Sequence, residues 1–241
     1  MEYILDVHLH TVLSGHANST VLENAEYARQ KGLKFMGMAD HAPGLPGGAH
    51  LYNFGLLWSI PDYLLGVRVF KGVEANIMDF SGKLDLPDKL LGKMDFVIAS
   101  LHSGVLETKS RQEHTDAVVA AMENRNVHVI GHPGSASFEL DMEQVVAAAA
   151  RTRTVLEVNN QSLNPKSHRY NGDDVLLGML ALCKKHRVPV LASSDAHICV
   201  NVGEFSLAKC LIERAGIGED MVLNTSGDRF LAAIDRKRSL E

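Results

Sequence analysis

The 241-residue sequence predicts an α/β fold, a barrel of seven parallel strands alternating with helices and one unit short of the (β/α)₈ form. Three observations predict it. Short runs rich in β-branched residues alternate with longer helical segments, the pattern of βα units. The runs are mainly apolar, as expected for strands buried on both faces. The length suits one such unit, so we expect a single domain over residues 1–241. A doubly wound open sheet is the alternative, because a strand count does not prove closure.

Seven apolar runs of four to six residues are expected as the strands. They cover residues 3–7, 35–39, 67–72, 96–99, 127–130, 155–158 and 188–192. No glycine-rich phosphate loop follows any of these runs, so the sequence gives no support to a nucleotide cofactor.

The helices are expected between these strands. The first covers residues 18–32, with Ser19 or Thr20 as its cap, Glu23 completing a capping box with Thr20, and Gly32 ending it. Four more are expected at residues 110–125, 141–151, 173–186 and 204–215. Residues 41–61 differ, because they are rich in glycine, proline and aromatic residues. We expect a functional loop there, one that could cover an active site.

Composition excludes several classes of protein. The chain has 24 Lys and Arg against 29 Asp and Glu, so it lacks the basic field that extended nucleic-acid binding requires. We expect no signal peptide, because the first ten residues are acidic and contain histidines, and no membrane span, because the apolar stretches are too short. Three cysteines without paired spacing fit a reducing compartment, which predicts the cytoplasm. Nothing in the sequence selects between a monomer and a homo-oligomer.

Polar residues collect where the predicted strands end. Six of the seven strands are followed by His, Asp or Glu: His8 and His10, Asp40 and His41, Glu74, His102, His132, and Asp195 and His197. Because the C-terminal ends of parallel strands open onto one face, we expect these side chains to lie together.

Spacing indicates what the cluster would bind. His8 and His10 are two residues apart, so both point to one side of a strand, and Asp195 and His197 repeat this spacing. Several buried ionisable groups need partners, and divalent cations can be shared by imidazoles and carboxylates. Mixed N and O ligands suit Zn²⁺, Mn²⁺ or Fe²⁺. His16 lies in the loop before the first helix and could contribute from the rim.

Read in order, the motifs resemble those of the polymerase and histidinol phosphatase (PHP) family. They are His8-x-His10, His16, Ala39-Asp40-His41, Gly72-x-Glu74-Ala-Asn76, His102, Gly131-His132-Pro133 and Ser194-Asp195-x-His197. The segments 72–76, 131–134, 157–160 and 223–226 are particularly similar to bacterial zinc phosphatases of that family.

The resemblance implies a distorted, TIM-like seven-stranded barrel that holds three metal ions, most simply Zn²⁺, with Mn²⁺ or Fe²⁺ as alternatives. It implies that Glu74 bridges two of the metals, with a metal-bridging hydroxide as the nucleophile. By position, His8, His10, Glu74 and Asp195 would bind the first metal, Glu74, His102 and His132 the second, and His16, His41 and His197 the third.

The expected activity is hydrolysis of phosphate esters, most simply small phosphomonoesters. Residues expected to act in catalysis are Glu74, Asp195, His197 and, secondarily, Asp40, which could orient a histidine or shuttle a proton. For substrate binding, the loop after the sixth strand offers Lys166, His168 and Arg169, and the loop after the second offers His50.

Four rival interpretations stay open. A nuclease or phosphodiesterase acting on nucleic-acid ends would use the same chemistry, although the net charge of −5 does not favour strand tracking. A histidinol phosphatase is another, although such relatives tend to be longer. An amidohydrolase typically has a bridging lysine from strand 4, where this chain has Ser100-Leu101-His102. A catalytically silent regulatory barrel should have lost ligands, whereas all nine positions are filled here.

Overall fold

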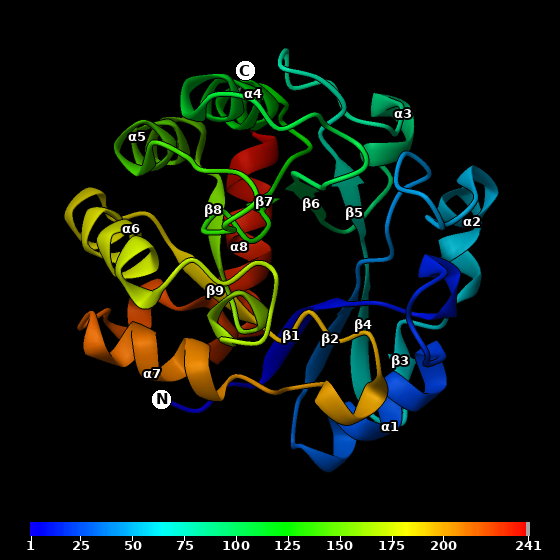
Figure 1. Cartoon of the computed structure of the whole chain (residues 1–241). Helices are drawn as coiled ribbons and strands as arrows, with labels where there is room; N and C mark the ends of the chain where they lie inside the picture. Colours follow the sequence, from blue (N-terminus) through cyan, green and yellow to red (C-terminus); the bar gives the residue numbers. More distant parts are fainter. Residues whose placement is uncertain (240–241) are drawn as a thin grey trace.

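The computed structural model describes residues 1–239 and has an α/β fold with parallel strands, as predicted (Figure 1). The strands form two sheets, one in the order β1-β2-β4-β3 and a fully parallel one in the order β5-β6-β7-β8-β9. The first sheet contains β1 (Leu5–Leu9), β2 (Phe35–Met38), β4 (Val67–Lys71) and β3 (Tyr63–Leu64), which is antiparallel to β4. The second contains β5 (Val73–Asn76), β6 (Val97–Ser100), β7 (Val129–Ile130), β8 (Val155–Asn159) and β9 (Val190–Ser193).

Each of the seven predicted strands is present, but they do not form one continuous hydrogen-bonded sheet. The predicted third strand is interrupted at Gly72, so that β4 pairs with β2 while β5 pairs with β6. A Cβ at Gly72 would lie 2.3 Å from the Phe96 ring, so any other residue there would require the ring or the backbone to move. The strand also continues further than predicted, which places Glu74 inside β5 instead of beyond a strand end.

Contacts at two seams join the sheets. Isolated parallel bridges pair Leu9 with Ala196 and His41 with Glu74. Asn224 also links β1 to β9: its amide nitrogen donates to the Leu5 carbonyl at 2.9 Å, and its amide oxygen accepts from the Ala192 N–H at 2.7 Å.

All five predicted helices are present: α1 (Val21–Gln30), α4 (Arg111–Glu123), α5 (Met142–Thr152), α6 (Asp173–His186) and α7 (Ser206–Arg214). Thr20 caps α1 in the predicted capping box with Glu23. Three further helices are α2 (Leu51–Leu56), α3 (Asp88–Leu91) and α8 (Gly227–Arg238). The segment expected as a functional loop contains α2. Short 3₁₀ helices are η1 (Val12–Ser14), η2 (Leu57–Ser59), η3 (Gln161–Leu163), η4 (Cys199–Asn201), η5 (Glu219–Met221) and η6 (Leu223–Thr225).

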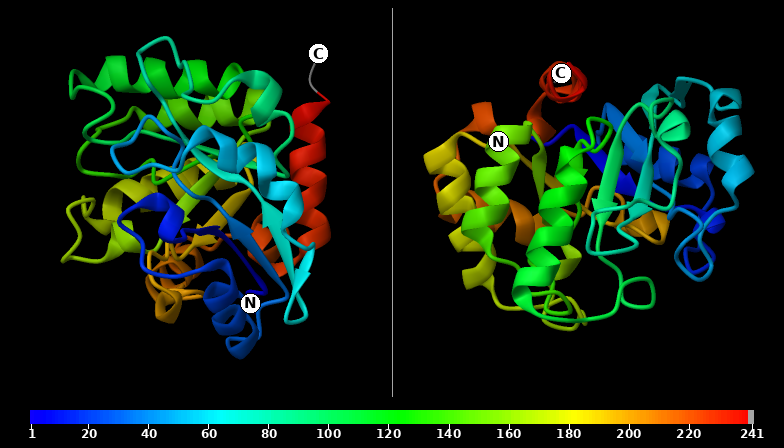
Figure 2. Two further views of the ribbon diagram at one scale, coloured as in Figure 1. Left: turned by 90° about the vertical axis from the view of Figure 1, so that its right-hand side faces the viewer. Right: turned by 90° about the horizontal axis from the view of Figure 1, so that it is seen from above.

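Helix α8 closes the end of the molecule opposite the strand C-termini. It runs behind the strands in Figure 1 and along one side in Figure 2. Its Phe230 packs against Phe70 and Phe96, with ring centroids 5.4 and 5.9 Å apart. These rings belong to a buried apolar cluster that also contains Leu5 and Ile98. Ionisable side chains can therefore gather at the other end of the strands without disrupting this core.

None of the helices between residues 1 and 239 is long and apolar enough to pass through a lipid bilayer.

Candidate metal centre

Glu74 lies at the centre of the predicted cluster, and its side chain is completely buried. One carboxylate oxygen, Oε2, is 3.3 Å from His8 Nε2 and 2.8 Å from His41 Nδ1. The other, Oε1, is 3.3 Å from His102 Nε2 and 3.0 Å from His132 Nε2. The two oxygens therefore face two separate sets of imidazoles, the arrangement expected of a bridging carboxylate.

Asp195 is a second buried carboxylate beside this group. Its Oδ1 is 3.1 Å from His10 Nε2, and its Oδ2 accepts from Asn159 Nδ2 at 3.1 Å and pairs directly with Arg169. Asp195 and His132 both have positive φ angles, 50° and 31°. Such backbone strain in residues other than glycine costs about 1–3 kcal/mol and is concentrated at functional sites.

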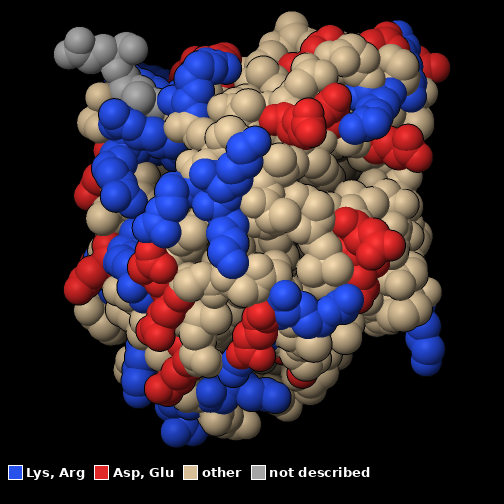
Figure 3. Space-filling model, turned by 90° about the vertical axis from the view of Figure 1, so that its left-hand side faces the viewer, with Lys and Arg blue, Asp and Glu red and all other residues tan. Residues whose placement is uncertain are grey.

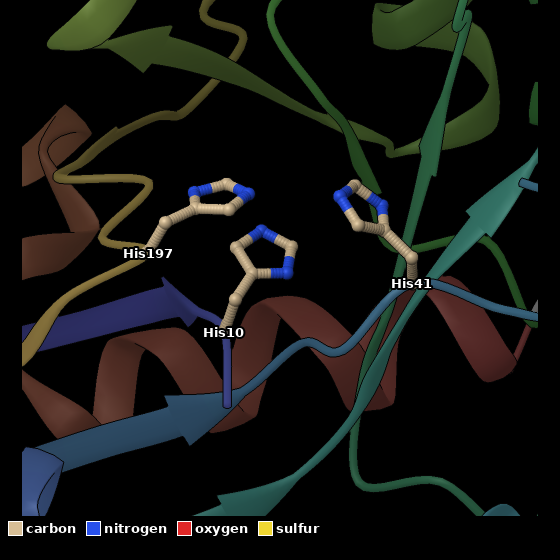
Figure 4. A group of neighbouring side chains, drawn as sticks. All are labelled: His10, His41 and His197. Atoms are coloured by element: carbon tan, nitrogen blue, oxygen red, sulfur yellow. The ribbon is translucent and has the colours of Figure 1, made fainter. Parts of the chain in front are cut away.

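Four imidazole rings stack beside the carboxylates. The rings of His10, His41 and His197 converge from the ends of β1 and β2 and from the loop after β9 (Figure 4). The centroid of His10 lies 4.4 Å from that of His41 and 4.2 Å from that of His197. His16 completes the stack, with its Nε2 3.0 Å from Nε2 of His197. Four rings this close cannot all be charged.

The electrostatics keep several of these rings neutral. Burial, together with His41, lowers the pKa of His10 well below its ordinary value. Burial and the neighbouring His197 lower the pKa of His16 to about 4, and burial and Arg169 lower that of His132 to about 4. Neutral imidazoles keep the lone pair that a metal ligand needs.

The pKa values of His8 and Glu74 shift toward their charged forms, because groups of opposite charge surround each of them. Burial alone would lower the pKa of His8, but the carboxylates of Glu157, Glu74 and Asp195 raise it well above its ordinary value. Burial would raise the pKa of Glu74, but His8 and other histidines hold it well below its ordinary value. Glu74 is therefore ionised and available as a ligand.

The residues present fit a metal cluster. Within residues 1–239, four buried atoms of this site have no hydrogen-bond partner: His8 Nε2, His41 Nδ1, Glu74 Oε2 and His102 Nε2. An unsatisfied buried polar atom costs about 1–3 kcal/mol, more if charged. Ligand atoms within 4.8 Å of one another form three groups: His8, His10 and Glu74; His41, Glu74 and His102; and His10, His41 and His197. Divalent cations would satisfy the unpaired atoms together.

Glu157 is a site residue to which no role was assigned from the sequence, although it begins one of the family-like segments, 157–160. It is fully buried in β8, and its Oε1 is 2.6 Å from His8 Nδ1 while its Oε2 accepts from the His132 N–H at 2.6 Å. A carboxylate that holds the remote nitrogen of a ligand histidine fixes its tautomer. The available signal was a lone charge within the apolar run 155–158.

Asp40 is turned away from the cluster and holds the loop after β1. Its carboxylate accepts from the Thr11 N–H at 2.7 Å and from the Ser14 hydroxyl at 2.6 Å. The same Ser14 oxygen accepts from the His41 N–H at 3.0 Å and lies 3.3 Å from His10 Nδ1. Asp40 thus contacts His10 and His41 indirectly, through Ser14.

A cleft of about 330 Å³ opens beside the cluster. Its lining includes His16, His41 and His102 of the cluster, the hydroxyls of Ser103, Ser135 and Ser137, and the apolar side chains of Leu101 and Phe138. Of the residues expected to bind substrate, His168 and Arg169 line this cleft, whereas Lys166 and His50 do not. His50 instead caps α2, where its Nδ1 accepts from the Tyr52 N–H at 3.2 Å.

Comparison with known proteins identifies the family. The model of the PHP domain matches residues 6–168, more than half of the chain. The chain belongs to the PHP domain family. This PHP protein is 41% identical over 238 residues to a probable phosphatase of Acetivibrio thermocellus, covering 99% of this chain and 98% of that one. It is 42% identical over 239 residues to a probable phosphatase of Caldanaerobacter subterraneus, covering 99% and 93%.

Two solved structures share the fold of this PHP protein. One is the histidinol phosphate phosphatase of Lactococcus lactis, solved with zinc, L-histidinol and phosphate, with a TM-score of 0.65, 17% identity, and 90% and 95% of the two chains covered. The other is a chain in archaeal ribonuclease P with mature tRNA, with a TM-score of 0.54, 15% identity, and 96% and 91% covered. At these identities the likeness concerns the fold alone.

Proposed function

We propose that this PHP protein is a metal-dependent phosphatase that hydrolyses small phosphomonoesters. The observation that carries the proposal is the position of Glu74, which turns its two oxygens to separate sets of histidines whose facing nitrogens are buried and partly unpaired. The curated relatives, of which this chain covers 98% and 93%, are named probable phosphatases, and these names support the same activity.

We propose the following ligand set, with Zn²⁺ as the preferred ion. His8, His10, Glu74 and Asp195 would hold one ion, Glu74, His102 and His132 a second, and His16, His41 and His197 a third. Close spacing supports parts of this set. His8, His10 and Glu74 lie together, Asp195 lies 3.1 Å from His10, His132 lies 3.0 Å from Glu74, and His16 lies 3.0 Å from His197. His41 lies close to His10 and His197 and also to Glu74 and His102, so it could serve either of two ions. We further propose that residues 1–241 act as one unit and that the two sheets function as a distorted seven-stranded barrel, since the ligands come from both sheets.

Divalent cations bound here would neutralise phosphoryl oxygens and lower the pKa of water. The chain's own residues would prepare the site for this. Arg169 is always charged and lies on the cleft wall, where it would bind a phosphoryl oxygen. The carboxylates around His8 favour its doubly protonated ring, so a cation would have to displace the proton on Nε2, while Glu157 would keep the other proton on Nδ1.

The shape and charge of the cleft favour a small substrate. A volume of about 330 Å³ is near the lower end of ligand pockets, roughly 300–1,000 Å³. The serine hydroxyls and Arg169 suit a phosphoryl group, while Leu101 and Phe138 offer an apolar surface to the leaving group. The net charge of −5 weighs against tracking along a nucleic-acid strand.

The test combines metal analysis of the purified protein with phosphate release from p-nitrophenyl phosphate, a panel of small phosphomonoesters and single-stranded DNA. We expect more than one metal ion per chain and turnover of monoesters ahead of DNA. Glu74→Gln should lose both metal and turnover, whereas Glu107→Gln, at an exposed position, should lose neither. Fewer than two ions under metal-replete conditions, with no phosphate release, would refute the proposal. Faster turnover of DNA than of any monoester would assign the site to phosphodiesters.

A further inference from the structure

A second cavity lies far from the metal centre and is lined by cationic side chains. Its volume is about 250 Å³, and Arg153, Arg187, Arg236 and His186 form its polar lining. The rest of the lining is aliphatic and includes Val188 and Pro189. No acidic residue among the described residues 1–239 lines it. We call it the arginine cavity.

The arginine cavity lies at the opposite end of the strands from the metal centre. Arg153 comes just before β8, and Val188 and Pro189 come just before β9, so this lining belongs to the N-terminal ends of strands. The histidine cluster lies at their C-terminal ends. A ligand in this cavity would therefore not occupy the catalytic cleft.

Two of the arginines have an unusual backbone. Arg153 and Arg187 end α5 and α6 in the left-handed conformation, with φ of 57° and 58°. This position after a helix is usually glycine, which adopts it without strain. Two helices thus end at the same cavity on an arginine whose backbone has the left-handed conformation that normally selects glycine. Departures of this kind are expected at functional sites.

Local charge points to an anion. The ends of α5, α6 and α8 carry eight of the chain's 24 Lys and Arg: Arg151, Arg153, Lys184, Lys185, Arg187, Arg236, Lys237 and Arg238. Figure 3 shows Lys and Arg gathered on this side of the molecule, toward the end of α8. Basic residues near a helix C-terminus stabilise the helix dipole, which accounts for the number of these residues but not for the meeting of three of them, Arg153, Arg187 and Arg236, at one cavity.

Contacts among these side chains leave capacity for a ligand. Arg153 donates one N–H to the Arg236 carbonyl at 3.1 Å, which fixes its place on the wall. Arg187 pairs with Asp220 at 2.6 Å, but both side chains are more than half exposed, so the pair is weak and screened. Each guanidinium has five N–H groups, so these contacts leave donors available.

We propose that the arginine cavity binds a phosphoryl dianion carried by a small molecule, at a site separate from the metal centre. Guanidinium groups match the geometry of phosphoryl oxygens, and the aliphatic part of the lining would contact an organic body attached to the phosphoryl group. A cavity of about 250 Å³ limits that body to a small one. Inorganic phosphate shares the recognised group and is the second source to be distinguished.

The experiment measures how fast phenylglyoxal modifies each arginine of the metal-loaded protein, by mass spectrometry of its peptides. The probes are sodium phosphate and the non-hydrolysable phenylphosphonate, at constant ionic strength. With a Kd near 1 mM, a probe at 10 mM should slow modification at Arg153, Arg187 and Arg236 about tenfold. Arg214, which is half exposed and paired with Asp173, is the control and should not be protected. Arg169 reports separately on the metal-side cleft.

Greater protection by phenylphosphonate assigns the cavity to an organic phosphate, and equal protection assigns it to inorganic phosphate. Protection at Arg169 with none at the three cavity arginines would overturn the proposal. Arg187→Gly puts glycine where the backbone favours it, so the variant should fold and keep its phosphatase activity. The affinity of this variant for the probes should fall about tenfold, and this should be seen as a loss of protection at Arg153 and Arg236. Unchanged protection in this variant would also overturn the proposal.

Discussion

Replacing Glu157 with glutamine tests how the protein prepares His8 for a metal. Glu157 is buried and surrounded by donors: His8 Nδ1 and Ser193 Oγ lie 2.6 Å from Oε1, while the His132 N–H at 2.6 Å and Asn159 Nδ2 at 3.1 Å lie beside Oε2. An ionised carboxylate accepts from all four. Glutamine has the same size but turns one oxygen into an NH₂ donor, so one side of the site must change.

The structure indicates which side changes. The His132 donor is a backbone N–H and cannot rearrange, so the glutamine oxygen should face it and the NH₂ should face His8 Nδ1. In the neutral form that binds a metal, His8 would then have to accept at Nδ1 and carry its one proton on Nε2, the atom 3.3 Å from Glu74 Oε2. That nitrogen would no longer have a lone pair for a cation. Losing such an outer contact typically costs 10–100-fold in metal affinity, or about 1.4–2.7 kcal/mol.

Competition between the protein and a chromophoric zinc chelator measures this affinity directly. Thermal unfolding of the metal-free proteins shows separately whether Glu157→Gln folds, and Glu107→Gln is the exposed control. A folded Glu157→Gln variant whose zinc Kd stays within about threefold of the wild type would refute the tautomer argument.

Four other perturbations follow from the structure. Arg169→Lys keeps the positive charge but loses the guanidinium, whose two N–H groups can bind two phosphoryl oxygens at once. Steady-state kinetics should therefore show KM for p-nitrophenyl phosphate rising about tenfold, and an unchanged KM would show that Arg169 does not bind substrate. Burial lowers the pKa of Lys237 to about 8, below its ordinary 10.5. As the pH rises, the folded protein therefore loses this proton before the unfolded chain does, so the free energy of unfolding should increase between pH 8 and pH 10.5. Urea unfolding at pH 7 and 10 should show that Lys237→Met abolishes this rise; a retained slope contradicts the assignment. Gly72→Ala forces a Cβ against Phe96 and should cost about 1–3 kcal/mol in urea unfolding, whereas a cost under about 0.5 kcal/mol would show that the ring moves freely. Chelation should lower Tm by roughly 10 °C, reversibly on adding zinc, because bound metal stabilises only the folded chain; an unchanged Tm would mean that the cluster does not bind metal tightly.

Local signals allowed most of the fold to be predicted. The capping box of Thr20 and Glu23 marks the start of α1, and Ser110 caps α4 in the same way with Glu113. Both depend on residues three apart, which a sequence displays directly. Helix α8 was not predicted, because packing of Phe230 on rings more than 130 positions earlier in the chain supports it.

Polar residues near strand ends predicted where the histidine cluster lies, but they did not predict the buried carboxylate of Glu157 that holds it. His8 and His132 come from the ends of apolar runs and meet around Glu74 as expected. Glu157 lies inside β8, and only the tertiary structure brings it to His8. The expectation for His50 rested on its place in a long loop, and a loop's path cannot be derived from composition. The break at Gly72 depends on contact with Phe96, which is equally invisible in the sequence.

The seams between the two sheets have a consequence for how the protein holds together. At one seam the paired residues are His41 and Glu74. At the other seam they are Leu9 and Ala196. Leu9 lies between His8 and His10 in the chain, and Ala196 lies between Asp195 and His197, just after β9. Ions shared by these side chains would cross-link the sheets at the places where backbone hydrogen bonds are sparse. Removing the ions should therefore loosen the molecule along two lines while each sheet stays intact. Amide hydrogen exchange should then quicken at the ends of β1 and β9 before it does in the middle of the five-stranded sheet.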